Sequence, residues 1–346
     1  MKNDRPLVAC EALLLGRDRI TGVERYTADI LCRSQGPYHL IIGSESPTSK
    51  MVREIALQRE WPVAQLTGNS LVAQQIGLGW YLRTQRSRLH GVHHFSLSPG
   101  ILGGGRPFTL TIHDVSAWRF PHTMSRGMRY LYRPLIERAL RSSQLRGIIT
   151  VSRFSQDEIG AVLNVPTQRI AVVYPTLGYL ARTHPRAVPK VSEPFYLHVG
   201  TVEPRKNIEL LISAFRRAGL ADSVLYLVGR QGWQSLPALP PNVIHLPHVR
   251  DAELAWLYQH AVALISASDY EGAGLPPAEA LTAGCRVFLR DIPVYREIYG
   301  SQANCWMFKA SDELSDLIRF PPAANPGLFQ FPRAKSFDEA VEDLHG

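Results

Sequence analysis

Two glutamates in the carboxyl-terminal half of the chain, Glu271 and Glu279, stand where carboxylates could accept hydrogen bonds from the hydroxyl groups of a ligand. The apolar run 261–265 predicts a buried strand, and the glycine-rich loop after it carries Glu271. Pro276 and Pro277 favour the first turn of a helix that continues through Glu279. Unpaired N–H groups at such a helix start bind anions. Together these groups suit a sugar nucleotide.

A pair of adjacent cations, Arg205 and Lys206, follows another predicted strand over 196–199 and precedes a predicted helix over 207–217. A lysine point charge, a planar arginine fork and the amino end of a helix are together suited to a diphosphate. The alternative is a solvated turn in which Asn207 caps the helix. The two glutamates in the same half of the chain favour the diphosphate.

The amino-terminal half offers one polar pair at the end of a strand. The run 108–112 predicts the strand, and His113 and Asp114 follow it directly. A histidine in this place could bond a substrate hydroxyl or stabilise a developing charge, and a structural histidine is the alternative. Gly22 opens a predicted helix over 23–32, which is a second place where backbone can approach an anion.

Strands and helices alternate in both halves, which predicts an α/β fold with two Rossmann-like domains, each built on a parallel sheet. Residues 176–194 contain three prolines and lack periodicity, so the boundary is expected there. We expect an amino-terminal domain over 1–180, a carboxyl-terminal domain over 190–325, and a helix within 330–346 that packs back on the first domain. The site is then expected in the cleft that the two domains face, at the carboxyl ends of their strands.

The charge is unevenly distributed along the chain. Residues 1–190 hold 25 Lys and Arg against 12 Asp and Glu, whereas residues 191–346 hold 13 against 18. A basic amino-terminal half indicates an anionic partner, which could be a membrane surface, a phosphorylated acceptor or nucleic acid, and a generic solubilising surface is the alternative. The predicted long basic helix over 124–145 suits anionic lipid, and a core-facing surface helix with solvated arginines is the alternative.

Several classes of protein are disfavoured. The sequence has no Asp-x-Asp, no HExxH, no His/Cys cluster, no P-loop and no GxGxxG after the first strand, so we expect no metal and no cofactor. The four cysteines are scattered, which favours reduced thiols in a cytosolic protein. No apolar run is long enough to span a membrane, and the first residues lack the apolar region of a signal peptide.

The spacing Glu271-x7-Glu279 resembles the E-x7-E signature of retaining glycosyltransferases of family 4, which have the GT-B fold. Further segments are similar to the bacterial polysaccharide (group 1) branch of that family. They are residues 22–26, 111–114, 148–155, 200–207 and 291–300. The likeness is dense over 195–300 and patchy over 1–175.

The resemblance implies a role for each residue that matches a motif. Glu279 would accept from the ribose hydroxyls of the donor, and Glu271 would meet the hydroxyls of the transferred sugar with His113 opposite. The donor diphosphate and sugar would also contact Gly22, Thr201, Arg205, Lys206, Gly272, Ala273, Gly274 and Leu275. The acceptor would lie near Glu24, Arg25 and Tyr26. Thr201 stands where many members have arginine, and Arg205 would compensate.

The implied activity is transfer of a hexose, with retention of configuration, to a lipid-diphosphate-linked glycan of a bacterial O-antigen, capsule or exopolysaccharide. Residues 200–207 resemble loops of mannosyltransferases, so mannose from GDP-mannose is the first choice. UDP-glucose, UDP-N-acetylglucosamine and dTDP-rhamnose are the alternative donors. The enzyme would be peripheral at the cytoplasmic face of the plasma membrane, with the leaving diphosphate as base and no metal.

Two other classes remain alternatives to a glycosyltransferase. A nicotinamide-dependent dehydrogenase would need a glycine fingerprint after its first strand, and Gly16 and Gly22 are too far apart for it. A non-catalytic binder of anionic membranes or nucleic acid would use the basic half alone and leave Glu271 and Glu279 without a role. We therefore expect no nucleic-acid partner.

Overall fold

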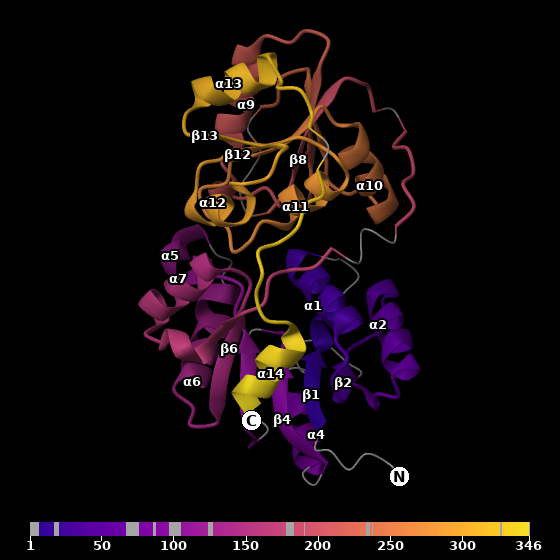
Figure 1. Cartoon of the computed structure of the whole chain (residues 1–346), viewed down its shortest axis with the longest axis vertical. Coiled ribbons are helices and arrows are strands. Elements are labelled where there is room, and N and C mark those ends of the chain that lie inside the picture. Colours follow the sequence, from indigo (N-terminus) through magenta and orange to yellow (C-terminus); the bar gives the residue numbers. More distant parts are fainter. Residues whose placement is uncertain are drawn as a thin grey trace. The chain divides into compact units, whose positions relative to one another are not determined.

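A computed structural model describes residues 7–16, 21–66, 76–85, 88–96, 105–123, 127–177, 183–189, 191–232, 236, 238–325 and 327–345. The chain divides into two compact units, an amino-terminal unit of residues 1–176 with 333–346 and a carboxyl-terminal unit of residues 177–332. Each unit is built on one parallel sheet with helices (Figure 1). The predicted class, two parallel-sheet α/β domains, is confirmed.

In the part of the amino-terminal unit that is described, seven strands form a parallel sheet in the order β3-β2-β1-β4-β5-β6-β7. Strands β2 and β5 are buried along their whole length, as expected for a parallel sheet covered on both faces. The strands are β1 (Leu7–Ala12), β2 (Tyr38–Ile42), β3 (Val63–Gln65), β4 (Leu89–His94), β5 (Phe108–Thr111), β6 (Leu145–Thr150) and β7 (Ile170–Val172).

Three helices of this unit begin at a capping side chain, which is Thr21 for α1, Ser46 for α2 and Ser152 for α7. Ser152 accepts from the backbone N–H of Ser155 at 3.0 Å and caps α7 (Arg153–Leu163). The other described α-helices are α1 (Gly22–Arg33), α2 (Pro47–Gln58), α4 (Leu78–Thr84), α5 (Ser116–Arg119), α6 (Arg133–Leu140) and α14 (Phe337–His345).

The last helix, α14, belongs to the amino-terminal unit although it follows the carboxyl-terminal unit in the chain. Its Asp338 carboxylate accepts from the Tyr38 hydroxyl at 2.8 Å and from the Gln35 backbone N–H at 2.7 Å. Phe337 stacks on Phe95 with ring centroids 5.2 Å apart. Polar bonds at the start of α14 and this aromatic contact hold the helix against the sheet.

In the carboxyl-terminal unit the described residues form six parallel strands in the order β10-β9-β8-β11-β12-β13. The apolar face of α9 packs with α13 and the sheet, and Leu211, Phe215 and Leu314 are buried there. The strands are β8 (Phe195–Val199), β9 (Val224–Val228), β10 (Val243–Leu246), β11 (Ala263–Ser266), β12 (Val287–Arg290) and β13 (Cys305–Phe308). The α-helices are α9 (Ile208–Ala218), α10 (Asp251–His260), α11 (Leu275–Thr282), α12 (Pro293–Tyr299) and α13 (Ser311–Arg319).

The predicted basic helix over 124–145 is wrong at its carboxyl end. The described part begins with a π-helical turn, Met128–Tyr132, and α6 ends at Leu140. Leu145 is instead the first residue of β6, where it is buried and pairs with Phe108. Leu145, five positions beyond the last residue of α6, therefore belongs to the sheet. The period of apolar residues alone does not distinguish a short buried strand from the continuation of a helix.

Some features singled out in the sequence lie outside the described residues. They are the chain start, residues 17–20 of the loop before Gly22, residues 124–126 of the predicted basic helix, and residues 178–182 and 190 of the predicted boundary. Among the helices that are described, none combines the length and apolar character needed to cross a bilayer.

Candidate functional site

The carboxyl-terminal unit brings two predicted loops together. Strands β8 and β11 are parallel neighbours in the sheet, so the loops that follow them leave the same edge side by side. The backbone N–H of Asp269 donates to the Arg205 carbonyl at 2.8 Å, and the Asn207 side chain reaches Asp269 at 3.5 Å. The loop over 200–207 and the loop over 267–274 are therefore in direct contact.

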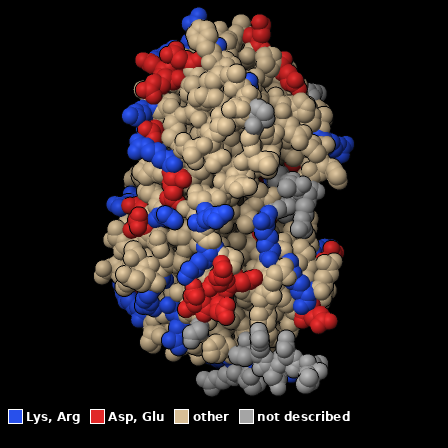
Figure 2. All heavy atoms as spheres, viewed as in Figure 1, with Lys and Arg blue, Asp and Glu red and all other residues tan. Residues whose placement is uncertain are grey.

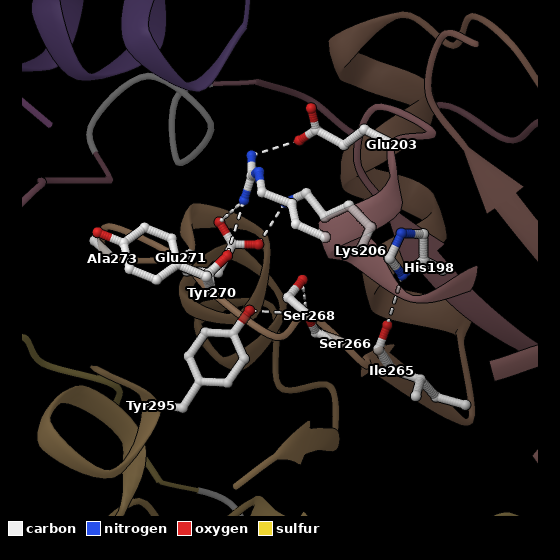
Figure 3. Close-up of polar contacts among 12 residues, drawn as sticks. His198, Glu203, Lys206, Ile265, Ser266, Ser268, Tyr270, Glu271, Ala273 and Tyr295 are labelled. Carbon is white, nitrogen blue, oxygen red and sulfur yellow. Dashed lines mark hydrogen bonds and ion pairs between the residues drawn. The ribbon is translucent and has the colours of Figure 1, made fainter. Parts of the chain in front are cut away.

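Four charged side chains of these loops form one cluster. Lys206 points toward Glu271 (Figure 3), and Glu203 pairs with Arg205. One oxygen of Glu271 lies 2.5 Å from Lys206 Nζ, and the other lies 3.0 Å from Arg205 Nη1. The second arginine terminus, Nη2, lies 2.5 Å from Glu203 Oε1. The Arg205 fork also donates to the Tyr270 carbonyl at 3.0 Å. Two cations and two carboxylates thus balance each other's charge at this edge of the sheet.

Burial and ion pairing oppose each other at Glu271. Burial raises the pKa of its carboxyl, but Lys206 and then Arg205 outweigh burial and hold the pKa at about 2. Burial also lowers the pKa of Lys206, and Glu271 partly offsets that effect. At neutral pH Glu271 is therefore ionised, in a place from which water is mostly excluded.

The second glutamate, Glu279, lies one turn inside α11, as predicted. It is buried, and its Oε2 accepts from the Tyr258 hydroxyl of α10 at 2.8 Å. Burial is the main cause that raises the pKa of Tyr299. Glu271 and Glu279 both lie close enough to raise it further. The two carboxylates therefore belong to one neighbourhood.

The start of α11 is held by specific packing. Gly274 precedes the helix with φ 74°, and a Cβ there would lie 2.6 Å from the Tyr295 ring. The Tyr299 hydroxyl lies 2.5 Å from the Gly274 carbonyl oxygen and 3.2 Å from that of Ala273. The segment that the sequence analysis assigned to donor binding, Gly272 to Leu275, is thus fixed at the amino end of the helix. Thr201 lies in the neighbouring loop, two residues after the end of β8.

The amino-terminal unit brings three other predicted residues together. The rings of His113 and Tyr26 meet edge to face with centroids 4.9 Å apart, and the Tyr26 hydroxyl donates to the Val173 carbonyl at 3.2 Å. Among the described atoms, His113 Nε2 is buried without a hydrogen-bond partner. Burial lowers the pKa of His113 to about 4, against the opposing effects of Asp114 and Glu24, so the ring is neutral at pH 7.

The structure also gives Glu24 a local role that the sequence analysis did not assign. Its carboxylate accepts from the Thr21 backbone N–H at 2.9 Å and from the Thr21 hydroxyl, which closes a capping box at the start of α1. Gly22 is the exposed first residue of this helix, and Arg25 is half-buried on it. The residues expected near the acceptor therefore share one helix amino end.

Sequence reasoning missed several members of the carboxyl-terminal cluster. Glu203 lies two residues before Arg205, and its spacing could have indicated a partner for that arginine. Tyr258 comes from a helix with no motif of its own, so nothing in the sequence pointed to it. Tyr295 lies in a segment already quoted for the resemblance, and its hydroxyl lies 2.8 Å from Ser266 Oγ (Figure 3).

The two units match two family profiles. The family described as Glycosyltransferase Family 4 matches residues 20–177, and the family described as Glycosyl transferases group 1 matches residues 182–320. With both halves of the chain matched and the two parallel-sheet units of the GT-B fold present, the chain belongs to the group 1, family 4 glycosyltransferases.

Particular relatives are similar over part of the chain. O-antigen chain mannosyltransferase B of Escherichia coli is 32% identical over 211 residues, which cover 55% of this chain and 54% of that protein. O-antigen chain mannosyltransferase RfbU of Salmonella typhimurium is 28% identical over 202 residues, again covering 55% and 54%. The match thus spans about half the length of these curated relatives.

Solved structures share the fold at low sequence identity. Anabaena HepE, crystallised with UDP and glucose, superposes with a TM-score of 0.62 and 16% identity, and the match covers 91% of this chain and 89% of that one. At this identity the likeness supports the GT-B fold alone.

Proposed function

We propose that the protein is a retaining glycosyltransferase that moves a hexose from a nucleoside diphosphate donor to a glycan in O-antigen or related surface polysaccharide synthesis. Mannose from GDP-mannose is the first choice of donor. The observation that carries the proposal is the convergence of Glu271, Arg205 and Lys206 at the carboxyl ends of two adjacent strands, with Glu279 one turn into the next helix.

Glu279 is proposed to hold the donor ribose. An ionised carboxylate accepts hydrogen bonds but donates none, so it selects hydroxyl groups. One of its oxygens already accepts from Tyr258, which fixes the orientation of the carboxylate. The carboxylate is thereby positioned to accept from a ribose diol.

Arg205 and Lys206 are proposed to neutralise the diphosphate. In the structure both are held by carboxylates, Arg205 by Glu203 and Glu271, and Lys206 by Glu271. These ion pairs keep two cations fixed and charged in a buried place. A cation that is already positioned stabilises the growing charge of a leaving diphosphate without first having to reorganise.

Glu271 and the backbone of Gly272 to Leu275 are proposed to bind the transferred sugar, and His113 to approach it from the amino-terminal unit. A neutral His113 can bond a sugar hydroxyl through the nitrogen that lacks a partner in the described structure. As the bond from the anomeric carbon to the diphosphate oxygen breaks, the acceptor hydroxyl attacks from the same face. Its proton passes to the departing diphosphate, which gives retention without a protein nucleophile or a metal.

The acceptor is proposed to be a lipid-diphosphate-linked glycan at the inner face of the bacterial plasma membrane, near Glu24, Arg25 and Tyr26. The names of the relatives, O-antigen mannosyltransferases, support a glycan acceptor. Figure 2 shows basic side chains on the visible face of the amino-terminal unit, interrupted by an acidic group over α14. A peripheral contact with anionic lipid would therefore use the basic surface outside α14.

Ligand stabilisation tests the proposal. Thermal unfolding is measured with GDP-mannose, UDP-glucose, UDP-N-acetylglucosamine and dTDP-rhamnose, and a donor at 100 times its Kd should stabilise the fold by about 2.7 kcal/mol. The anomeric configuration of the product is then read by NMR. A product of inverted configuration, or no stabilisation by any nucleotide sugar, would refute the proposal.

A further inference from the structure

A buried histidine lies in β8, the strand that leads into the loop over 200–207 with Arg205 and Lys206. His198 is the fourth residue of β8, and its ring is 1% exposed. Its Nδ1 lies 3.0 Å from the Ile265 carbonyl of β11. A carbonyl only accepts, so Nδ1 carries the hydrogen and Nε2 presents a bare lone pair.

The lone pair of His198 Nε2 has no donor within the described structure. Burial lowers the pKa of the ring to about 4, so the ring stays neutral and Nε2 stays an acceptor at physiological pH. Buried acceptors are nearly always hydrogen-bonded in folded proteins, so an unsatisfied one next to a candidate site requires an explanation.

A candidate donor is the Lys206 ammonium, which borders the same small space beside Gly200. A Cβ built on Gly200 would lie 3.5 Å from His198 Nε2, 3.4 Å from Lys206 Cε and 3.6 Å from Lys206 Nζ. In Figure 3 one ring nitrogen of His198 meets Ile265 and the ring lies beside Lys206. The Nε2 acceptor of His198 and the ammonium of Lys206 therefore both border the space beside Gly200.

Lys206 has three N–H donors, and Glu271 takes one of them at 2.5 Å. We propose that His198 is a positioning residue for Lys206. The ammonium, which does not bond Nε2 in this structure, turns within the space beside Gly200 and donates a second hydrogen bond to Nε2, so that the third N–H is directed at the donor diphosphate. The inference rests on the proposed function for its last step, and the contact between His198 and Lys206 is testable without any donor.

Two protein acceptors would solve a particular problem of lysine. An ammonium on a four-carbon stem is a mobile point charge, unlike the planar guanidinium of Arg205. When two of the three N–H groups are held by protein acceptors, the direction of the third is fixed as well. Supporting hydrogen bonds of this kind hold a binding side chain in the orientation that its ligand requires.

The first experiment tests the contact in the donor-free protein. The Nε2 signal of His198 is recorded by ¹⁵N NMR on histidine-labelled protein for the wild type, K206M and G200A. Gly200→Ala places a methyl group between the two side chains at ordinary contact distances. We expect both variants to move the signal toward that of an imidazole nitrogen without a hydrogen bond. A signal unchanged in both variants would overturn the proposal, because Nε2 would then be satisfied by water or by nothing.

The second experiment tests the positioning role by calorimetry with GDP, UDP and dTDP. His198→Asn keeps an N–H for Ile265 but lacks the distal acceptor, and His198→Gln supplies one. We expect H198N to weaken binding of the preferred nucleotide about tenfold, as for one hydrogen bond to a charged group, and H198Q to restore most of the loss. In the K206M background H198N should cause no further loss. Additive losses would overturn the role.

A matched control separates this effect from general damage. His260 of α10 makes the same kind of bond, with Nδ1 2.9 Å from the Trp256 carbonyl, on an exposed part of the helix. His260→Asn should leave nucleotide affinity unchanged. If the wild type bound none of GDP, UDP and dTDP, the proposed function would fail, while the NMR comparison would still decide whether Lys206 bonds His198.

Discussion

Replacing Glu271 by glutamine gives the most direct measure of the charge cluster. Gln has the shape of Glu but no charge, so E271Q leaves the buried Lys206 and the partly buried Arg205 with one carboxylate fewer. The pKa of Glu271 is about 2 in the folded protein against an ordinary 4.5, which corresponds to about 3 kcal/mol. The Glu271 side chain is only 9% exposed, so solvent screening does little to reduce that value. Breaking a buried ion pair typically costs about 3–5 kcal/mol, which agrees.

The assay is urea unfolding combined with hydrogen exchange at the amides of β8 and β11, which report on the carboxyl-terminal unit by itself. We expect E271Q to lower the unfolding free energy by about 3 kcal/mol at pH 7. Asp312→Asn is the control, because its partner Arg217 and Asp312 itself are 54% and 75% exposed. That substitution should cost about 1 kcal/mol or less.

The pH dependence gives the sharper result. The folded pKa of Glu271 lies below its unfolded value, so its stabilisation is present above about pH 4.5 and is lost as the pH falls toward 2. The difference in stability between the wild type and E271Q should shrink across that window. A difference below 1 kcal/mol at pH 7, or one that stays constant down to pH 2, would refute the reasoning.

Three further predictions concern other parts of the molecule. Tyr258→Phe removes the hydroxyl that donates to Glu279 at 2.8 Å, so donor affinity measured by calorimetry should fall about fivefold; an unchanged Kd would contradict the ribose role. Asp338→Ala removes the acceptor for the Tyr38 hydroxyl and the Gln35 N–H, and should lower the stability of α14 by about 2 kcal/mol in hydrogen exchange; wild-type protection would show that these bonds contribute little. Transfer should continue in EDTA, and activity lost to EDTA and restored by Mg²⁺ would contradict neutralisation by Arg205 and Lys206.

Local sequence carried the information for the main elements around the site. The apolar runs before the two loops are buried strands because each is covered on both faces, and that requirement is visible as continuous hydrophobicity. The prolines at 276 and 277 lie in the first turn of α11, because proline lacks only an N–H that is unpaired there. Short strands such as β3 and β13 escaped prediction because few residues carry too little periodic signal.

The sequence by itself determined which residue types stand at the strand ends, because strand, loop and helix follow from local apolar pattern, proline and glycine. It did not determine their partners. Glu203 and Glu271 share Arg205, Tyr258 bonds Glu279, and His198 faces Gly200 and Lys206, and these pairings join segments up to 66 positions apart. Only the parallel packing of neighbouring strands brings such segments to one edge, because hydrogen bonds and ion pairs depend on distance in space and leave no local pattern in the chain.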